Sequence, residues 1–165
     1  MMEKETDRVY MIDDPEIKKQ IIHRSYTSIP HSMALGLEFI ELRRNVAVGK
    51  LPYQKKLVGN IVTGAVHTGV LISLIDSIAG LSVFCALPEY ESFATLDLRI
   101  DCFKPSSPNQ DLFAFAECYK LTRTIAFVRG SIYHNNEDDP IAGCVASFFR
   151  SGKFHSFLQS ETGGP

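Results

Sequence analysis

The sequence predicts an α+β fold in which one long central helix is wrapped by a curved antiparallel β-sheet. Apolar side chains surround the helix axis on all sides over residues 68–87, and such a helix must be covered all round. Four apolar segments follow it, and most are separated by clusters of Pro, Asn, Asp or Gly, which indicates strands joined by short turns. A chain of 165 residues has the size of one domain, so we expect a single core over residues 1–165.

The N-terminal stretch DDPEIKKQIIHRSY predicts a short amphipathic helix. Asp14 suits the N-cap, Pro15 suits the first turn, and three isoleucines recur at helical spacing. We assign residues 1–35 to an N-terminal helical extension. The stretch LEFIELRRNVAVGKLPY then predicts a strand or a hairpin that turns near Asn45. Residues 54–66 hold two glycines and little periodicity, so we expect a structured loop there.

The four segments after the long helix predict an antiparallel meander. They read SFATLDLRIDCF, DLFAFAECYK, RTIAFVRGSIYH and PIAGCVASFFR, and residues 151–165 are expected to form a C-terminal tail. The second segment has a small-residue face, which would let the helix approach closely, and an aromatic face, which predicts a subunit interface because an apolar outer face needs a cover. The small face holds Leu112, Ala114, Ala116 and Cys118, and the aromatic face holds Phe113, Phe115 and Tyr119.

Charge and hydropathy predict a cytoplasmic protein without a nucleic-acid or membrane partner. A formal net charge of -2 and a pI near 6.2 give no general attraction for polyanions or anionic lipid. The first twenty residues hold no apolar core of the kind that a secretory signal needs. The apolar run 70–87 has nearly membrane-spanning length, but Asp76 near its middle would cost about 2.5–3.5 kcal/mol on insertion.

The four cysteines predict neither a disulfide framework nor a metal site. They lie far apart in apolar runs, with no C-x-x-C pair and no histidine at zinc spacing. We expect them to be reduced core residues and expect no metal ligands in the chain. They are Cys85, Cys102, Cys118 and Cys144.

The stretch TGAVHTGVLISLIDSIAGL, residues 63–81, places one carboxylate, Asp76, in the middle of the apolar helix. A buried carboxylate needs a raised pKa, a charged partner or several hydrogen bonds. One interpretation is structural, with hydrogen bonds from Ser73, Ser77 or backbone amides. The other is a general base or nucleophile whose pKa is adjusted by its apolar surroundings.

The start of the same helix supplies a second set of candidate groups. His67 precedes Asp76 by nine positions, or roughly 13 Å along a helix, so the two cannot form one site within a single chain. If two helices meet in antiparallel fashion across a two-fold axis, the histidine end of each approaches the middle of the other. Free N–H groups at the helix start could then hold an oxyanion. Alternatively, His67 is only a capping or packing residue.

These motifs resemble the hotdog-fold acyl-coenzyme A thioesterases of the PaaI-like, phenylacetate-degradation type. That family has a G-x-x-H-G-G turn, an Asp nine residues after the His, and strands reading T-x-D-L and F-x-x-P. The matching residues are Gly64, His67, Gly69 and Asp76, followed by TLDLRIDCFKP. The resemblance implies a hotdog fold and hydrolysis of an acyl-CoA thioester to free acid and coenzyme A. It implies no cofactor, since coenzyme A is part of the substrate, and a homo-oligomer, either a dimer or a dimer of dimers.

The resemblance also implies roles for individual residues. Asp76 would be the base or nucleophile, and the backbone amides of Thr68 and Gly69 from the other subunit would polarise the thioester carbonyl while His67 shapes that loop. Thr95 matches a position that helps to hold the attacking water. Thr68 stands where the family has Gly, and a β-branched residue would be disfavoured there if the position required positive φ.

Two further residues are candidates for substrate binding. Asn60 lies one residue before the position of the family's Asn, which falls at Ile61. Arg123 would contact the coenzyme A phosphates, or would be only a solvated charge at a strand end. Two other functions stay open: a hotdog dehydratase or hydratase, whose His and acid are arranged differently, and a non-catalytic acyl-CoA sensor, which would need a DNA-binding module that the first 35 residues are too short to supply.

Overall fold

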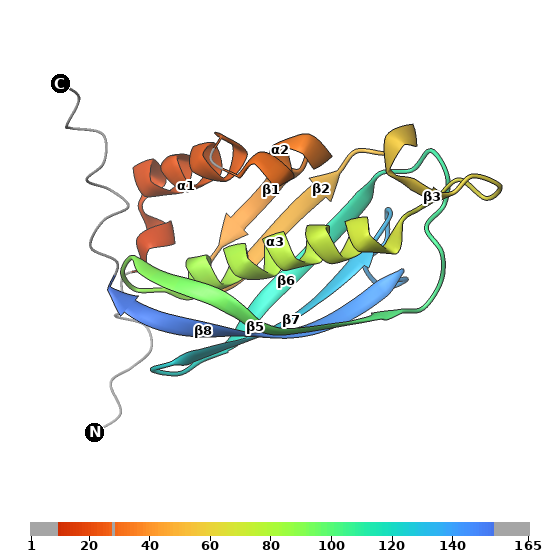
Figure 1. Ribbon diagram of the computed structural model, residues 1–165. Coiled ribbons are helices and arrows are strands. Elements are labelled where there is room, and N and C mark those ends of the chain that lie inside the picture. Colours follow the sequence, from red (N-terminus) through yellow and green to blue (C-terminus); the bar gives the residue numbers. More distant parts are fainter. Residues whose placement is uncertain (1–9, 28, 154–165) are drawn as a thin grey trace.

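A computed structural model describes residues 10–27 and 29–153, and it places one long helix across a six-stranded antiparallel sheet (Figure 1). The helix is α3 (Thr68–Ala86), and the strand order is β1-β2-β6-β7-β8-β5. The strands are β1 (Glu38–Arg43), β2 (Val46–Leu51), β5 (Glu91–Cys102), β6 (Leu112–Leu121), β7 (Ile125–Tyr133) and β8 (Ala142–Lys153). The predicted long helix wrapped by a curved antiparallel sheet is therefore confirmed.

Helix α3 is the core of the domain. By length and composition it could cross a membrane, but ten of its residues are buried inside the protein. The sheet face beneath it carries small residues, as predicted: Ala114 and Ala116 of β6 are fully buried. A side chain at Gly49 of β2 would collide with Ile78 of the helix, so glycine is needed there for close approach. Small strand residues thus let α3 lie directly on the sheet.

The order of the strands differs from a simple meander. Strands β6, β7 and β8 are neighbours as predicted, but β5, which precedes them in the chain, pairs with β8 at the far edge. The connection over residues 103–111 carries the chain from β5 past β8 and β7 to β6. One edge of β5 therefore has no partner among the described strands.

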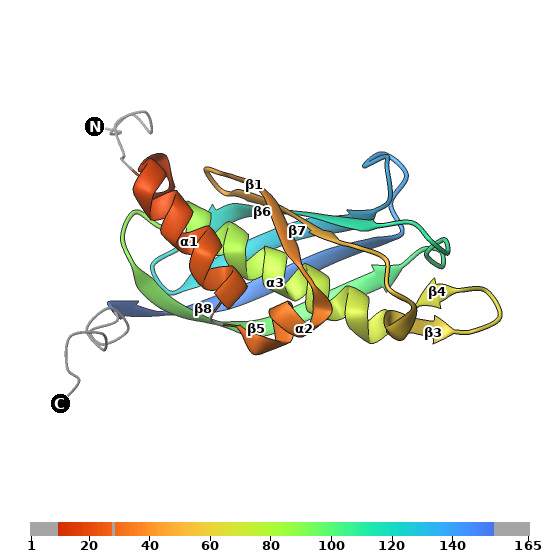
Figure 2. The same cartoon turned by 90° about the horizontal axis from the view of Figure 1, so that it is seen from above.

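The segment before α3 is more ordered than the predicted loop. It contains a short 3₁₀ helix, η3 (Lys55–Leu57), and a small hairpin of β3 (Val58–Asn60) and β4 (Ala65–Val66). The hairpin projects from one end of the molecule (Figure 2). Short strands of mixed composition carry no clear alternation, which is why the sequence pattern did not reveal them.

The N-terminal extension consists of η2 (Met11–Asp13), α1 (Pro15–Thr27) and α2 (Pro30–Leu35). Asp14 caps α1 as predicted, since its Oδ1 accepts a hydrogen bond from the Glu16 N–H at 2.8 Å. Figure 2 shows α1 crossing over α3 on the side away from the sheet. Buried side chains at Ile12 and Ile21 join this layer to the core.

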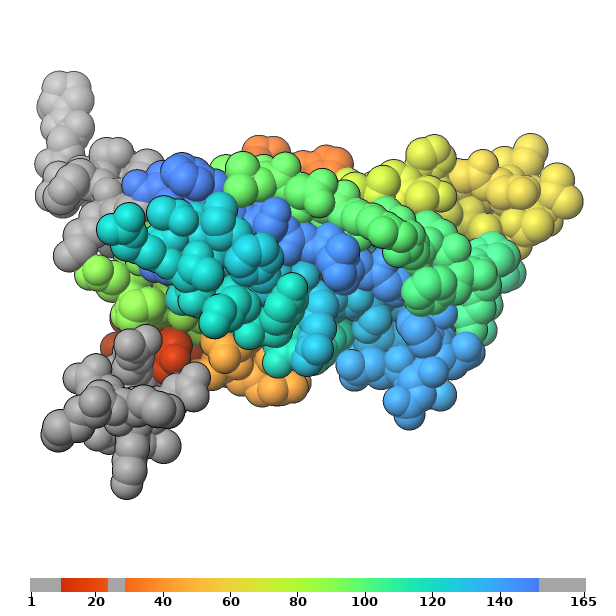
Figure 3. Space-filling view, turned by 90° about the horizontal axis from the view of Figure 1, so that it is seen from below, coloured from red at the N-terminus to blue at the C-terminus, as the bar shows by residue number. Residues whose placement is uncertain are grey.

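The other face of the sheet is covered by no helix of the described part of the chain, and Figure 3 shows its strands side by side from β2 to β5. Tyr119 is 52% exposed there, and Phe113 and Phe115 are half-buried. The subunit interface expected on this face stays a prediction. Strand β8 extends three residues into the predicted tail of residues 151–165, and residues 1–9 and 154–165 lie outside the described part.

The cysteines are free thiols, and one of them departs from expectation. Cys85, Cys118 and Cys144 are buried, but Cys102 at the end of β5 is exposed. The prediction that all four belong to the core is wrong for Cys102, because it lies on the unpaired edge strand rather than in the middle of the sheet.

Candidate active site

Asp76 lies on the third turn of α3 and is half-buried. The Thr95 hydroxyl, on β5, donates a hydrogen bond to Asp76 Oδ1 at 3.0 Å. The helix therefore holds the carboxylate and the edge strand brings its partner across from the sheet. Two residues that the sequence proposed for the same chemistry are together within one chain.

The neighbouring serines do not satisfy Asp76. Ser73 Oγ donates to the Gly69 carbonyl at 3.1 Å, and Ser77 Oγ donates to the Ser73 carbonyl at 2.8 Å. Both hydroxyls are used by the helix backbone. Within residues 10–27 and 29–153, Asp76 has no ion pair, and Thr95 supplies its one hydrogen bond. The structural interpretation based on Ser73 and Ser77 is therefore not supported, and the carboxylate retains acceptor capacity.

Asp76 and Thr95 line one part of a pocket of about 690 Å³. Such a volume is within the usual range for small-molecule sites, and the rest of its wall is mainly apolar. Most of the wall comes from the N-terminal extension, α3 and the first half of β5. Residues of these three parts that contact the pocket include Ile17, Ile21, Gly80, Phe84, Phe93 and Ala94.

The start of α3 is capped by the side chain of His67. Its Nδ1 accepts a hydrogen bond from the Gly69 N–H at 2.9 Å, and its carbonyl accepts one from the Val70 N–H, also at 2.9 Å. The Gly69 amide, predicted as an oxyanion donor, is therefore occupied by the cap. No hydrogen bond among the described residues uses the Thr68 N–H outside the helix ladder, so Thr68 is the better candidate donor.

Thr68 adopts ordinary backbone geometry. It is the first residue of α3, and Asn45 and Asn109 are the non-glycine residues with positive φ in the described part of the chain. A β-branched residue is therefore compatible with this position, and the departure from the family's Gly does not distort the helix start.

The structure leaves His67 and Asp76 apart within one chain. They occupy the cap and the third turn of the same helix, roughly 13 Å apart along its axis. Asn60 is exposed, and its Oδ1 accepts hydrogen bonds from Val62 and Thr63 N–H at 3.0 and 3.2 Å, which shapes the hairpin loop. Its predicted contact with substrate stays a prediction.

Arg123 is exposed in the turn between β6 and β7. It lines a second cavity of about 510 Å³ together with Lys120 and Arg150, and this cavity shares no residue with the Asp76 pocket. The structure therefore does not bring Arg123 to Asp76 within one chain, and its contact with coenzyme A phosphates stays a prediction.

Two features of the pocket surroundings were not visible in the sequence. His31 of α2 lies in the pocket wall with its Nε2 3.1 Å from Ser73 Oγ, although 42 residues separate the two in the chain. Burial, and secondarily the negative charge of Asp76, raise the pKa of the Cys144 thiol to about 11.

Comparison with known proteins identifies the family. Residues 63–141 match the thioesterase superfamily. A crystal structure of a Pseudomonas aeruginosa protein superposes with a TM-score of 0.72 at 37% identity, covering 79% of this chain and 97% of that one. The chain belongs to the thioesterase superfamily. It is also similar to the medium/long-chain acyl-CoA thioesterase YigI of Salmonella typhimurium, with 28% identity over 133 residues, 73% of this chain and 84% of YigI.

A further structural relative extends this thioesterase comparison. The phenylacetic acid degradation protein PaaI of Thermus thermophilus, solved as a mutant, has 25% identity and a TM-score of 0.65, covering 74% of this chain and 99% of that one. The predicted hotdog fold and PaaI-like family are confirmed, and so is the class of enzyme, a thioesterase that hydrolyses thioesters. The individual roles of Asp76, Thr95, His67, Thr68 and Gly69 stay predictions.

Proposed function

We propose that this thioesterase hydrolyses acyl-coenzyme A thioesters to a free acid and coenzyme A, with Asp76 as general base or nucleophile. One observation carries the assignment: Asp76 faces a large apolar pocket, and its one hydrogen-bond donor among residues 10–27 and 29–153 is the neutral Thr95 hydroxyl. The similarity to an acyl-CoA thioesterase of medium and long chains supports the same substrate class.

The chemistry follows from the residues at the polar end of the pocket. As a base, Asp76 takes a proton from a water molecule that the Thr95 hydroxyl helps to orient, and the water attacks the thioester carbonyl. As a nucleophile, Asp76 attacks the carbonyl itself and forms an anhydride that water then hydrolyses. In both cases the tetrahedral intermediate expels the coenzyme A thiolate. Neither route calls for a metal or a redox cofactor.

The oxyanion donor is proposed to come from a second copy of the chain. The Thr68 N–H, at the positive end of the α3 dipole, is well suited to a developing oxyanion. It belongs to the same helix as Asp76, at its far end. It therefore cannot reach a thioester carbonyl that is bound at Asp76 of the same chain. An antiparallel pair of α3 helices would place Thr68 of each copy near Asp76 of the other.

The edge of the sheet supports such a dimer. Strand β5 carries Thr95 on an unpaired edge, and Leu96 beside it is 58% exposed. Ile72, on the first half of α3, is also exposed. A second copy would cover this apolar surface, and the outer face with Phe113 and Tyr119 would serve a dimer of dimers.

Hydrolysis of an acyl-CoA panel tests the proposed activity. Wild-type protein is assayed with esters from acetyl to palmitoyl, including phenylacetyl and hydroxybenzoyl, and the released thiol is followed by absorbance. We expect a best substrate with kcat/KM of at least about 10⁴ M⁻¹s⁻¹. Absence of thiol release with every ester would overturn the proposed function.

Mixing two inactive variants tests the shared site. Thr68→Pro removes one N–H at the first helical position, where proline is well tolerated, and the preceding His67 already has an extended conformation that proline permits. Thr68→Ala, which retains the N–H, is the matched control and should stay active. When Thr68→Pro is mixed equally with Asp76→Asn, about half of the dimers are mixed and each has one intact site. Roughly a quarter of wild-type activity should then return.

The complementation experiment has a clear opposite result. Native mass spectrometry establishes whether mixed dimers form. If they form and stay as inactive as either parent, the two halves of the site come from one chain. A mass of about 18 kDa by light scattering at micromolar concentration would contradict the oligomer directly.

A further inference from the structure

One face of α3 forms a continuous side of the pocket. Asp76, Gly80 and Phe84 follow one another at intervals of four residues, so they lie on the same side of the helix, and all three line the pocket. The carboxylate is at one end of this row and an aromatic ring at the other. Between them, the glycine leaves the helix surface without a side chain.

Aromatic side chains line the pocket beside Gly80 and close its end. Phe84 packs edge-on against Tyr90 at 5.3 Å between ring centroids and against Phe93 at 6.4 Å. Phe93 in turn packs edge-on against Phe148 at 6.0 Å. Phe93 and Phe148 lie beside Gly80, because a β-carbon there would be 3.6 and 3.7 Å from them, and Phe84 with Tyr90 forms the apolar end wall.

The side of the pocket opposite α3 comes from the N-terminal extension. Met11 of η2 and Ile17 and Ile21 of α1 contribute apolar side chains, and α1 crosses over α3 at this level (Figure 2). The extension is thus a wall of the same pocket whose polar end holds Asp76 and Thr95. The lining of the pocket changes from polar at Asp76 and Thr95 to apolar at the aromatic rings. Such a pocket suits a ligand with a reactive head and an aliphatic tail.

We infer that this channel between α1 and α3 binds the acyl tail of the substrate as an extended hydrocarbon chain, and that Gly80 determines the chain length it accepts. The inference rests on the proposed acyl-CoA thioesterase function, because it places the thioester carbon at Asp76. It adds where the acyl tail lies in this chain and the residue that limits its length.

The geometry of the helix sets the length. Eight residues separate Asp76 from Phe84, or about 12 Å along the axis, and four separate Asp76 from Gly80, or about 6 Å. An extended chain of three bonds spans 3.3–3.6 Å in a polypeptide, or about 1.2 Å per bond. The channel therefore holds roughly ten carbons of an extended chain, and Gly80 lies beside about the fifth.

Burial of the tail gives the expected trend with chain length. Each methylene removed from water contributes about 0.8 kcal/mol, which is a factor of about four in binding. For the wild type, kcat/KM should rise about fourfold per added methylene from butanoyl- to decanoyl-CoA. Beyond about ten carbons the rise should stop, because the aromatic end wall blocks further extension.

Substitution of Gly80 tests its role, and the structure provides a matched control. A β-carbon at this position would lie 3.6 Å from Phe93 and 3.7 Å from Phe148, which is ordinary contact, so Gly80→Ala fits the helix without displacing a neighbour. Gly80→Leu adds three further carbons against the Phe93 and Phe148 rings and so fills the channel at this level. Decanoyl-CoA should lose about 200-fold more in kcat/KM than butanoyl-CoA, whose tail ends before Gly80, and this factor is the product of four methylenes. Gly80→Ala should retain most of the decanoyl activity.

A second variant approaches the channel from the opposite wall. Ile17→Phe on α1 enlarges a half-buried side chain on the far side, so it should also lower the preferred chain length if α1 and α3 enclose the tail. This variant decides the question if Gly80→Leu does not fold, which circular dichroism establishes. Folded Gly80→Leu and Ile17→Phe proteins with the wild-type chain-length profile would overturn the inference and leave the proposed function intact.

Binding of unreactive analogues separates this inference from the proposed activity. S-butyl- and S-decyl-coenzyme A thioethers lack the carbonyl, and isothermal titration calorimetry measures their affinity for each variant. We expect the wild type to bind the decyl compound more than a hundredfold tighter than the butyl compound, and Gly80→Leu to lose that preference. Absence of hydrolysis with every thioester would overturn the proposed function. Equal affinities of the wild type for the two thioethers would overturn the tail site, whether or not thioesters are hydrolysed.

Discussion

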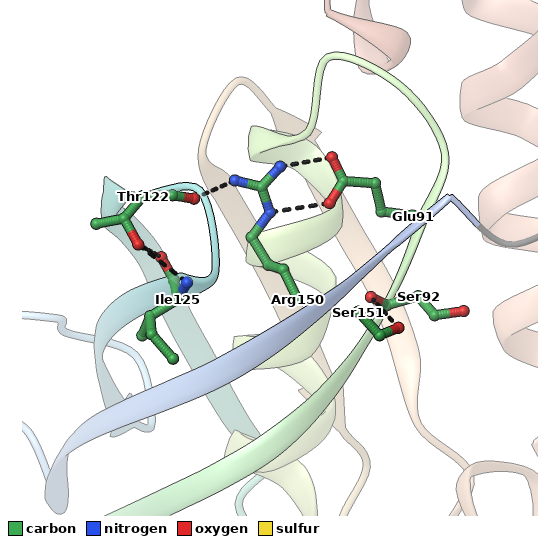
Figure 4. Close-up of polar contacts among 6 residues, drawn as sticks. All are labelled: Glu91, Ser92, Thr122, Ile125, Arg150 and Ser151. Carbon is green, nitrogen blue, oxygen red and sulfur yellow. Dashed lines mark hydrogen bonds and ion pairs between the residues drawn. The ribbon is translucent and has the colours of Figure 1, made fainter.

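Asp76 and Glu91 are two carboxylates beside the same strand, and their surroundings differ. Glu91 begins β5 and is 9% exposed, and Arg150 of β8 binds it through two hydrogen bonds, Nε to Oε2 at 3.0 Å and Nη2 to Oε1 at 2.5 Å. The remaining Arg150 nitrogen, Nη1, donates to the Thr122 carbonyl, so the guanidinium joins β8 to β5 and to the β6–β7 turn (Figure 4). In the described part of the chain, the Thr95 hydroxyl is the one hydrogen-bond partner of Asp76.

The hydrogen-bond partners distinguish a structural carboxylate from a reactive one within the same fold. Glu91 is neutralised by a charged partner in a fixed fork geometry, which leaves it little capacity for another ligand. Asp76 faces the pocket and accepts one hydrogen bond, from neutral Thr95, among the described residues, so a water molecule or a substrate can still use its oxygens. We expect substitutions at the two sites to affect different properties of the protein.

Asp76→Asn should produce the largest effect on activity. We expect kcat to fall at least about a hundredfold, and up to about ten-thousandfold, the range for loss of a positioned proton-transfer group. The free energy of unfolding should change by less than about 1 kcal/mol, because the Thr95 hydroxyl can still donate to the amide oxygen. Thiol release and urea denaturation measure the two quantities. Wild-type turnover would exclude Asp76 from the mechanism, and a variant that unfolds would favour the structural interpretation.

Arg150→Met should show the opposite pattern. It leaves Glu91 buried without its partner, which typically costs about 3–5 kcal/mol of unfolding free energy. The activity of the folded fraction should stay near that of the wild type, because the ion pair lies outside the Asp76 pocket.

The double variant Glu91→Gln/Arg150→Met is the control for this second prediction. It removes both charges, so it should recover a large part of the lost stability in urea denaturation. Loss of catalysis by well-folded Arg150→Met protein would show that the two carboxylates are not separate in function.

Thr95→Val should give a smaller effect on catalysis. The substitution preserves the shape of the side chain and removes the hydroxyl that donates to Asp76, so we expect kcat/KM to fall about tenfold, the equivalent of one hydrogen bond to a charged group. Thr95→Ser retains the donor and should preserve activity. Equal rates for the valine and serine variants would exclude the hydroxyl from positioning Asp76.

The smallest expected effect concerns Cys144, because the charge of Asp76 contributes to the raised pKa of its thiol. Burial is the larger cause of its raised pKa, about 11, and the carboxylate is the smaller one. At pH 8 the thiol should therefore be protonated and unreactive toward iodoacetamide in both wild type and Asp76→Asn, while exposed Cys102 is labelled in both. Peptide mass spectrometry after brief labelling tests this, and rapid labelling of Cys144 in the folded variant would show that charge outweighs burial.

The sequence predicted the parts of the molecule that depend on local pattern. All-round apolarity located α3 to within one residue of its observed end, and Asn45 marked the hairpin turn because its positive φ of 63° suits asparagine. Thr95 was proposed by resemblance, and the structure adds its hydrogen bond to Asp76.

Features that depend on distant residues could not be read from pattern alone. Alternation predicts that β5 is a strand but does not determine its neighbour, so its place beside β8 was missed. The pocket joins α1 to residues of α3 and β5 about sixty or more positions later, a distance that no periodicity connects. The cap of α3 depends on the orientation of the His67 ring, and for that reason the occupied Gly69 amide was not foreseen.

The pairing of β5 with β8 also affects the order in which the site forms during folding. Thr95 is opposite Phe148, about fifty residues later, and Glu91 meets Arg150 at the same pair of strands. Closing a loop of this length costs entropy before the contacts compensate for it, so pairings of high sequence separation tend to form slowly. On the ribosome, β5 must wait for the last described strand to emerge. Helix α3 can therefore form early with Asp76 in place, whereas Thr95 reaches it only when the sheet is complete.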